Sequence, residues 1–319
     1  MKEKEYVFSY SLDNKRYHTL NFHNKTVYGG RVGKAVIDAG FTCPNKDGTK
    51  GTGGCIYCMD GSGYFTAAQG GDIYDSVQRQ LSAEKERIFK KYPDSMIIAY
   101  FQANTNTYAP VETLRSAFTA ALDFGVTGIS IGTRADCLPD DVIELLSQLN
   151  SKTDLTVELG LQTVHDRTAA VINRCYDYRE FLSGYEKLRN AGIRTCLHII
   201  NGLPGETKED MLDTAREVAR LHPDAVKIHL LHVNSNTALE RMYLSGEYIP
   251  LGREEYIDIV ISQLEYFPQD IVIERITGDA DKKYLVAPKW SADKIAVLGG
   301  IDKQMKVRDT YQGIKAEAM

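Results

Sequence analysis

Three cysteines in one glycine-rich stretch are the residues whose types and spacing are best suited to chemistry. Cys43, Cys55 and Cys58 are spaced as C-x11-C-x2-C, and four glycines lie between the first two. Glycine lets a backbone turn sharply, and thiolates are ligands that soft metal centres prefer. The stretch therefore predicts three thiolates wrapped around one metal centre.

Three interpretations of this stretch are open. Buried free cysteines are one, although a C-x2-C among glycine, lysine and aspartate disfavours it. Structural zinc is the second, but it closes its site with four ligands, and no fourth cysteine or histidine is close in the sequence. An iron–sulfur cluster is the third. A four-iron cluster normally takes four thiolates, so three would leave one iron open to a small molecule and make the site reactive.

The spacing of the remaining three cysteines does not indicate a metal site. Cys137, Cys175 and Cys196 are separated by 38 and 21 residues, so they form no second cluster motif. We expect them to be small buried or half-exposed side chains, one of which could donate a hydrogen atom. His198 lies in the middle of a predicted strand and is expected to pack in the core.

Composition places the chain among globular proteins of a reducing compartment. Of its 319 residues, 43% are hydrophobic and 25% are charged, which is ordinary for a folded domain. It has no run of 18 apolar residues that could cross a membrane and no secretory signal, so we expect a cytoplasmic protein without membrane partners. Its cysteines are then better explained as ligands or core residues than as disulfides.

The net charge of −5 excludes a basic field over the whole molecule. A local basic patch could still bind RNA, although ordinary solvated side chains explain the same residues. These residues lie near the C-terminus: Lys282, Lys283, Lys289, Lys294, Lys303, Lys306 and Arg308.

Short apolar runs alternate with helical patterns along the chain. Such alternation predicts βαβ units and a parallel sheet. We therefore expect an α/β fold, a partial (β/α)6 TIM-like barrel over residues 31–235, with a short N-terminal cap (1–30) and a C-terminal extension (236–319). The predicted strands are 34–38, 96–101, 128–132, 155–161, 195–200 and 225–231, with 271–277 in the extension. The predicted helices are 73–92, 111–124, 140–149, 178–190, 208–221 and 253–267.

Polar residues follow the predicted strands, and in such sheets the active site lies at the carboxyl ends of the strands. The cysteine stretch follows the first strand. The later strands are followed by residues 102–107, 133–136, 162–163 and 201–206, with Glu158 at the fourth strand and Lys227, His229 and His232 at the sixth. We expect these groups to line one large polar pocket, with at most one of the two histidines in it, because residues three apart in a strand face opposite sides.

The cysteine stretch, DAGFTCPNKDGTKGTGGCIYC, resembles the cluster loop of radical S-adenosylmethionine (SAM) enzymes. Their usual spacing is C-x3-C-x2-C, and the longer first gap is similar to that of the YhcC/YtqA-type (MnmL-like) proteins and the Elongator catalytic subunit. The resemblance continues through YFQANTNTYAP, IGTRADCLP, INRCYDY and NGLPGET, and covers roughly residues 10 to 310. The segment TRAD resembles the Elongator TRPD, with Ala135 in place of proline.

The resemblance implies two cofactors, a 4Fe-4S cluster on the three cysteines and SAM on its open iron. Reductive cleavage of SAM would then give a 5′-deoxyadenosyl radical, with flavodoxin or ferredoxin as the low-potential electron donor. It also implies a set of cofactor-binding residues, although the family's GGE motif is missing at Asn104. These residues are Tyr57, Gln102, Asn104, Thr105, Arg134, Gln162, Arg174, Gly202, Pro204 and Gly205.

The substrate implied by the resemblance is tRNA. The family relationship points to the wobble uridine, whose carboxymethylaminomethyl side chain would be trimmed to aminomethyl. Purely structural roles for three of the cofactor residues stay open. Arg134 could pair only with Asp136 or Asp140, Gln162 could cap a turn, and Arg174 could form a surface ion pair.

Two other functions stay open at this stage. A coproporphyrinogen dehydrogenase type of enzyme would need several arginines at the pocket mouth, and only Arg134 and Arg174 can be placed there. A zinc-stabilised tRNA-binding module without activity would need a fourth ligand beside the cysteines and would not need Gln162.

Overall fold

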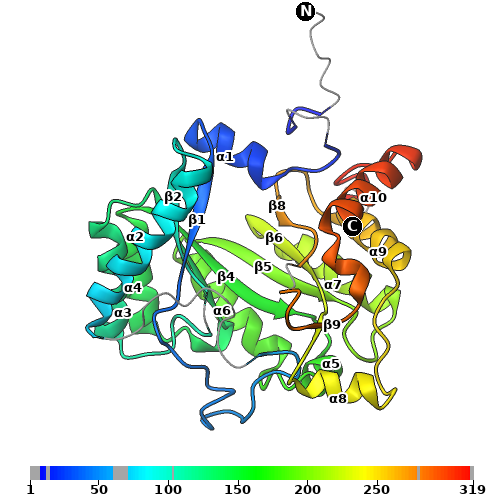
Figure 1. The fold of residues 1–319 in the computed structure, drawn as a ribbon, viewed down its shortest axis with the longest axis horizontal. Helices are drawn as coiled ribbons and strands as arrows, with labels where there is room; N and C mark the ends of the chain where they lie inside the picture. The colour runs from blue at the N-terminus through cyan, green and yellow to red at the C-terminus, as the bar shows by residue number, and fades with distance from the viewer. Residues whose placement is uncertain (1–7, 12–14, 60–70, 103, 279–280, 317–319) are drawn as a thin grey trace, which may run out of the picture. The chain divides into compact units, whose positions relative to one another are not determined.

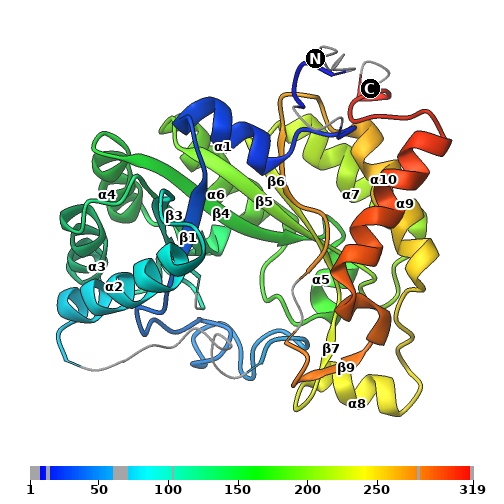
Figure 2. The same cartoon turned by 45° about the horizontal axis from the view of Figure 1, so that its top comes forward.

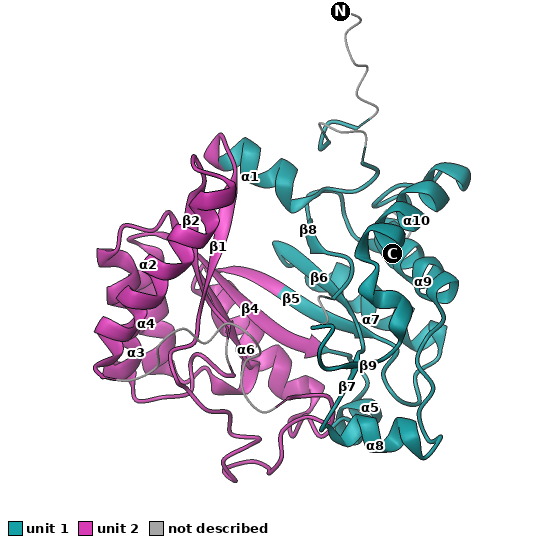
Figure 3. Ribbon diagram, viewed as in Figure 1, with its two compact units in different colours: residues 1–27, 162–172, 197–319 teal, residues 28–161, 173–196 magenta. Residues whose placement is uncertain are grey.

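The computed structural model describes residues 8–11, 15–59, 71–102, 104–278 and 281–316. The chain divides into two compact units, which Figure 3 shows in different colours. Unit 2 comprises Tyr28–Leu161 and Asn173–Cys196, and unit 1 comprises Met1–Val27, Gln162–Ile172 and Leu197–Met319. These bounds differ from the predicted division at residues 30 and 235, because strands of the predicted core and of the predicted extension belong to the same unit.

Unit 2 is built from parallel strands in chain order with helices on their outer side. β1 (Val32–Ile37) pairs with β2 (Met96–Phe101), β2 with β3 (Gly128–Thr133), and β3 with β4 (Asp154–Gln162), the last residue of which is assigned to unit 1. Figure 1 shows the covering helices, of which α2 contacts α3 and α3 contacts α4. These helices are α2 (Ile73–Lys91), α3 (Val111–Asp123), α4 (Asp140–Asn150) and α6 (Tyr178–Asn190).

The two faces of this sheet differ in chemistry. On the helix side Phe101 packs edge-on against Phe118 of α3, with ring centroids 5.1 Å apart. Glu158 lies on the opposite face, buried to 1% exposure. It accepts hydrogen bonds from Lys34 (3.0 Å), Tyr100 (2.8 Å) and Ser130 (3.1 Å). A buried carboxylate with three donors is fully compensated, so the inner face of β1 to β4 carries a polar network rather than an apolar core.

Unit 1 contains β6 (Ala225–Leu230) paired in parallel with β8 (Val272–Arg275). β5 (Arg194–Asn201) begins in unit 2 and ends in unit 1. Helix α9 (Arg253–Tyr266) contacts both α7 (Lys208–Leu221) and α10 (Lys294–Val307), as Figures 1 and 2 show. The shorter elements are α1 (Leu20–Tyr28), α5 (Asp166–Val171), α8 (Ala238–Leu244) and the antiparallel pair β7 (Val233–Asn234) and β9 (Leu285–Ala287).

The strand order of the sheet is β1-β2-β3-β4-β5-β6-β8. The predicted α/β partial barrel is confirmed, with one strand more than the six expected, because the predicted strand 271–277 joins the same sheet as β8. Within the described residues, we find no helix with the length and apolar character needed to cross a membrane.

Candidate functional site

The cysteine loop directly follows β1. Cys43 and Cys55 are half-buried and Cys58 is exposed. Two short turns fix their backbone: the amides of Lys46 and Asp47 donate to the carbonyl of Cys43, and the amide of Cys58 donates to that of Cys55 (2.9 Å). Cys55 and Cys58 therefore lie in the same turn, while Cys43 lies in the preceding turn.

The two thiols of the C-x2-C turn influence each other. A hydrogen bond between them raises the pKa of Cys55, which burial raises further, and lowers the pKa of Cys58. The nearby positive charge of Lys46 adds to the lowering at Cys58. Metal ligation needs thiolates, and this turn favours a thiolate at Cys58.

Asparagines hold the cysteine loop against the segment before α6. Asn173 donates through Nδ2 to the carbonyl of Gly54 (2.7 Å) and more weakly to that of Thr52 (3.3 Å). The Asn45 side chain donates to the carbonyl of Asn173 and lies 3.7 Å from Cys55 Sγ. Asn173 and Cys175 have positive φ values of 56° and 60°, backbone conformations that cost free energy outside glycine and cluster at functional sites.

The predicted residues after β2 fix the chain just before Cys43. Asn104, at φ 56°, donates to the carbonyl of Phe41 (2.8 Å) and accepts from Lys46 (3.3 Å). The amide of Thr105, a buried residue, donates to the carbonyl of Thr42 (3.2 Å). Gln102 is exposed. Asn104 and Thr105 thus contact the cysteine loop, which leaves open whether they also contact a cofactor.

Arg134, after β3, forms a bidentate ion pair with Asp136, in which both N···O distances are 2.9 Å. Lys50 of the cysteine loop binds the same carboxylate (2.8 Å) and also Glu180 (2.8 Å). Burial alone would raise the pKa of Asp136, but its hydrogen bonds and ion pairs with Arg134 and Lys50 outweigh it and lower that pKa. The pairing of Arg134 with Asp136 foreseen from the sequence is confirmed, and the carboxylate links the cysteine loop to the tip of β3.

Arg174 is among the largest fully buried side chains, at 1% exposure. It donates to the carbonyls of Leu161 (2.6 Å) and Tyr176 (3.0 Å). Its guanidinium lies 4.5 Å from the centre of the Tyr176 ring, and that of Arg134 lies 4.7 Å from the same centre. The interpretation of Arg174 as a surface ion pair is therefore wrong. A contact with the carboxylate of SAM stays a prediction.

Tyr57, between the last two cysteines, is half-buried, and burial raises the pKa of its hydroxyl. The phenol is therefore neutral at physiological pH. Tyr57 lies in the same turn as Cys55 and Cys58, and its contact with a cofactor stays a prediction.

Unit 1 carries the other predicted cofactor residues. Gln162 has φ 61°, and its side-chain oxygen is buried without a hydrogen-bond partner among the described residues. Gly202 (φ 86°) donates its amide to Met211 Sδ (3.2 Å) and accepts from the hydroxyl of Tyr248 (2.8 Å). Pro204 is buried, and Gly205 follows at φ 79°. A buried carbonyl without a donor is costly, so Gln162 is suited to receive a donor from a ligand.

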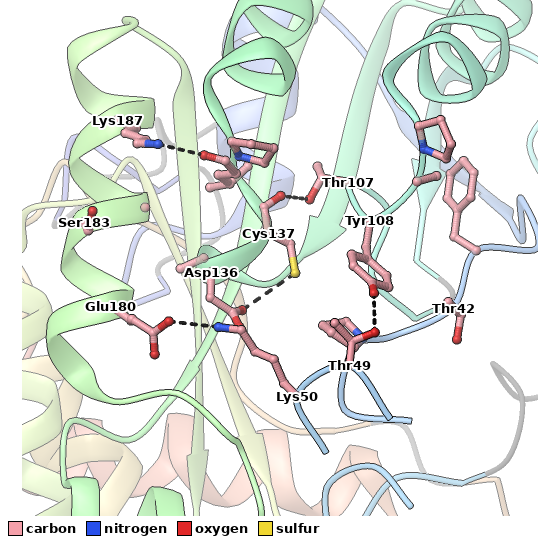
Figure 4. Close-up of a pocket in the computed structure, with 18 of the residues that line it drawn as sticks. Thr42, Thr49, Lys50, Thr107, Tyr108, Asp136, Cys137, Glu180, Ser183 and Lys187 are labelled. Atoms are coloured by element: carbon pink, nitrogen blue, oxygen red, sulfur yellow. Dashed lines mark hydrogen bonds and ion pairs between the residues drawn. The ribbon is translucent and has the colours of Figure 1, made fainter. Parts of the chain in front are cut away.

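A cavity of about 890 Å³ lies beside the cysteine loop in unit 2. Thr42 and Pro44, which flank Cys43, line it, and Figure 4 shows Lys50, Asp136 and Cys137 at its wall. Burial, and next the charge of Asp136, raise the pKa of Cys137 to about 12, so its thiol stays protonated. The cavity gives the outer side of the loop room for a small molecule.

The spacing of the three thiols disfavours one of the metal centres that the sequence left open. One set of three potential ligand atoms within 4.8 Å of one another is found among the described residues, and it is His165, Asp210 and Asp213, not the three cysteines. Two sulfurs on one zinc ion, each about 2.3 Å from it, can be at most about 4.6 Å apart. The three thiols therefore do not fit a single zinc ion in this arrangement, whereas a cluster that takes each thiolate on a different iron accepts wider spacing.

These features define a class of protein, an α/β partial barrel with a cysteine-rich loop after its first strand. The chain matches the Radical SAM superfamily over residues 47–218 and the Radical_SAM C-terminal domain over residues 223–307. It is also 47% identical over 308 residues to the uncharacterized protein YtqA of Bacillus subtilis, covering 96% of this chain and 94% of that protein. The chain belongs to the radical SAM superfamily, whose cofactors are a 4Fe-4S cluster and SAM.

More distant relatives include proteins that act on tRNA. A tRNA uridine(34) acetyltransferase of Methanocaldococcus jannaschii is 27% identical over 161 residues, which cover 50% of this chain and 29% of that protein. The structure of archaeal Methanocaldococcus infernus Elp3 shares the fold, with a TM-score of 0.63 and 18% identity. The match covers 89% of this chain and 65% of that chain.

Several residues of the site escaped the sequence analysis. Asn45, Lys50, Asn173 and Tyr176 contact the loop or its supports, although their partners lie up to 130 residues away in the sequence. The signal that could have found them is the density of polar and aromatic residues around Arg174, in the segment INRCYDY.

Proposed function

We propose that this radical SAM enzyme acts on the wobble uridine of tRNA, where it trims a carboxymethylaminomethyl side chain to aminomethyl. The observation that carries the proposal is the similarity of half the chain to a tRNA uridine(34) acetyltransferase. The fold shared with archaeal Elp3 supports it. The carboxymethyl carbon lies between the amine and the carboxylate, and hydrogen-atom abstraction by a 5′-deoxyadenosyl radical is suited to a C–H bond at such a carbon.

Cys43, Cys55 and Cys58 would hold the cluster, with Tyr57 beside them. The bound cofactors supply a 5′-deoxyadenosyl radical, and the residues of this chain place it and keep water away. Asn104 and Thr105 fix the start of the loop, and the ion pair of Lys50 with Asp136 fixes its middle. Gln162, Arg174, Gly202, Pro204 and Gly205 are proposed to bind SAM, together with Gln102 and Arg134.

Electron supply and tRNA binding are part of the same proposal. The exposed side of the loop at Cys58 is accessible to a flavodoxin or ferredoxin. The C-terminal basic residues supply positive charge for the phosphate backbone. Five lysines of this set are exposed: Lys282, Lys283, Lys289, Lys303 and Lys306.

The experiment compares modified nucleosides of tRNA from wild-type cells, a deletion strain, and the deletion strain carrying Cys58→Ala. We expect the deletion and the Cys58→Ala strain to accumulate carboxymethylaminomethyluridine and to lack its aminomethyl derivative, while the wild-type gene restores the profile. An unchanged wobble-uridine profile would refute the tRNA substrate. Reductive cleavage of SAM by the purified protein tests the radical chemistry separately.

A further inference from the structure

Asn45 places an amide against one of the predicted cluster ligands. The residue is fully buried. Its Nδ2 lies 3.7 Å from Cys55 Sγ and also donates to the carbonyl oxygen of Asn173. A flipped amide would turn its oxygen toward that carbonyl oxygen, so the hydrogen-bond pattern itself orients the N–H groups toward Asn173 and the sulfur.

The loop is built around this amide. The carbonyl of Asn45 accepts from the amide of Gly54 (2.8 Å). A side chain at Gly51 would overlap Asn45 Oδ1 and come within 2.8 Å of Cys175 Sγ. Asn173, which accepts from Asn45, is itself fastened to Gly54 (2.7 Å). Asn45 thus has one position available, and that position faces Cys55.

The carbonyl oxygen of the Asn45 side chain is less well satisfied than its nitrogen. Asn45 Oδ1 is buried without a hydrogen-bond partner among the described residues. Burying an unpaired carbonyl costs free energy, so the arrangement is not the one that best satisfies this side chain. The N–H groups of Asn45 have partners while its carbonyl oxygen has none among the described residues, and one of these N–H groups points at the sulfur of Cys55.

We propose that Asn45 is a positioning residue that donates an N–H···S hydrogen bond to the Cys55 thiolate and raises the reduction potential of the cluster. The inference rests on the proposed ligand role of Cys55. One-electron reduction adds negative charge to the cluster and its sulfurs, so a donor dipole stabilises the reduced state more than the oxidised state. Asn45 therefore makes the electron transfer that precedes SAM cleavage easier.

The test is an EPR-monitored redox titration of anaerobically reconstituted Asn45→Leu protein without SAM or tRNA. Leucine has nearly the same shape as asparagine but neither a donor nor a charge, so the midpoint potential is expected to move to a more negative value. Gln80→Leu is the matched control. Gln80 is a buried amide whose side chain binds the backbone of Asp38 (2.8 and 2.9 Å) ahead of the loop and the hydroxyl of Ser76 (3.2 Å).

An unchanged potential in Asn45→Leu at full iron content would overturn the proposal, as would an equal shift in Gln80→Leu. If the variant holds no cluster, wild-type protein carrying asparagine labelled with nitrogen-15 in the side-chain amide replaces it. Pulsed EPR of the reduced cluster should then show a nitrogen-15 coupling, and its absence would refute the hydrogen bond.

The outcomes separate this inference from the proposed function. A shifted potential together with an unchanged tRNA profile would support Asn45 and refute the tRNA substrate. A wild-type protein that binds no iron would overturn the cysteine assignment and the role of Asn45 with it.

Discussion

At the scale of single residues, the carboxylate of Asp136 connects the cysteine loop to the residues after β3. Its side chain is 1% exposed and it forms ion pairs with both Arg134 and Lys50. Removing one partner of a buried ion pair leaves a charge without compensation, which costs far more than losing a surface pair. One of the contacts that hold the cysteine loop therefore comes from an acid that is distant from it in the sequence.

Asp136→Asn should lower the free energy of unfolding by about 3 kcal/mol, because Arg134 stays buried beside an uncharged amide. Urea denaturation measures the change. Asp140→Asn is the control, since Asp140 pairs with Lys187 at 93% exposure of its own side chain. It should leave the unfolding curve unchanged, and an equal loss in both variants would contradict the argument.

At the scale of residues, local spacing was enough to predict candidate ligands, whereas the residues that support the loop needed the structure. The C-x11-C-x2-C spacing is local, so the cysteines and Tyr57 could be named without a structure, and the pairing of Arg134 with Asp136 is two residues apart. Lys50 and Glu180, by contrast, are 130 residues apart. Contacts of that kind depend on how the strand tips converge, which no local pattern encodes.

At the scale of elements, the packing of α6 on the segment after β3 depends on the absence of a side chain. A Cβ at Gly184 would overlap the carbonyl oxygen of Ala135 and lie 2.7 Å from its carbonyl carbon. The backbone of the helix at Gly184 is therefore packed directly against the backbone of the 3-10 turn Ala135–Cys137. This close approach places Glu180 of the same helix within reach of Lys50.

Gly184→Ala should destabilise the protein by roughly 2 kcal/mol, because overpacking outweighs the better helix propensity of alanine. Gly299→Ala in α10 is the control, since a Cβ there would meet nothing within 4 Å. It should stabilise the protein by about 0.5–1 kcal/mol. Thermal unfolding of both variants measures the difference, and a stabilising Gly184→Ala would contradict the close packing.

The N-terminus of α7 predicts a pH dependence. Asp210 accepts from the amide and the hydroxyl of Thr207 (2.8 and 2.7 Å), and the backbone hydrogen bond is the main cause that lowers its pKa to about 2. Its unfolded value is about 3.9, so the stabilisation is present above pH 4 and disappears as the pH falls through 2.

Asp210→Asn should therefore cost about 1 kcal/mol at pH 7, measured by denaturant titration. The wild-type and variant curves should approach each other as the pH falls from 4 and converge below pH 2. A difference that stays constant over that range would exclude the ionised capping carboxylate as its source.

The elements themselves were predictable where the hydrophobic pattern is regular. The strand 96–101 and the helices 178–190 and 208–221 have the predicted bounds. Helix α10 was missed because Gly299 and Gly300 interrupt its pattern, and its stability comes from packing against α9. The short helices α5 and α8 carry too few residues for a periodicity to show.

On the scale of the whole molecule, charge is distributed unevenly. The chain has a net charge of −5, yet residues 281–308 hold seven lysine and arginine residues against three aspartates. Binding to a phosphate backbone should therefore be local, weak and sensitive to salt.

Lys303→Glu with Lys306→Glu should weaken tRNA binding about tenfold at 0.1 M salt and reduce the slope of log affinity against log salt by about 2. Filter binding over a salt series measures both. Lys90→Glu with Lys91→Glu makes the same change in net charge on α2 and should alter neither. Equal weakening by the two pairs would indicate a general charge effect.

The two ends of the chain meet inside unit 1. His18 accepts at its carbonyl from the amide of Ile273 (2.8 Å), and its own amide donates to the side chain of Gln312 (2.8 Å), whose backbone amide donates to the carbonyl of Arg16 (2.9 Å). During synthesis on the ribosome, residues 16–18 emerge well before Ile273 and Gln312, with which they pair. The strands β1 to β4 can pair in the growing chain, whereas the contacts of residues 16–18 can form only after residue 312 has emerged.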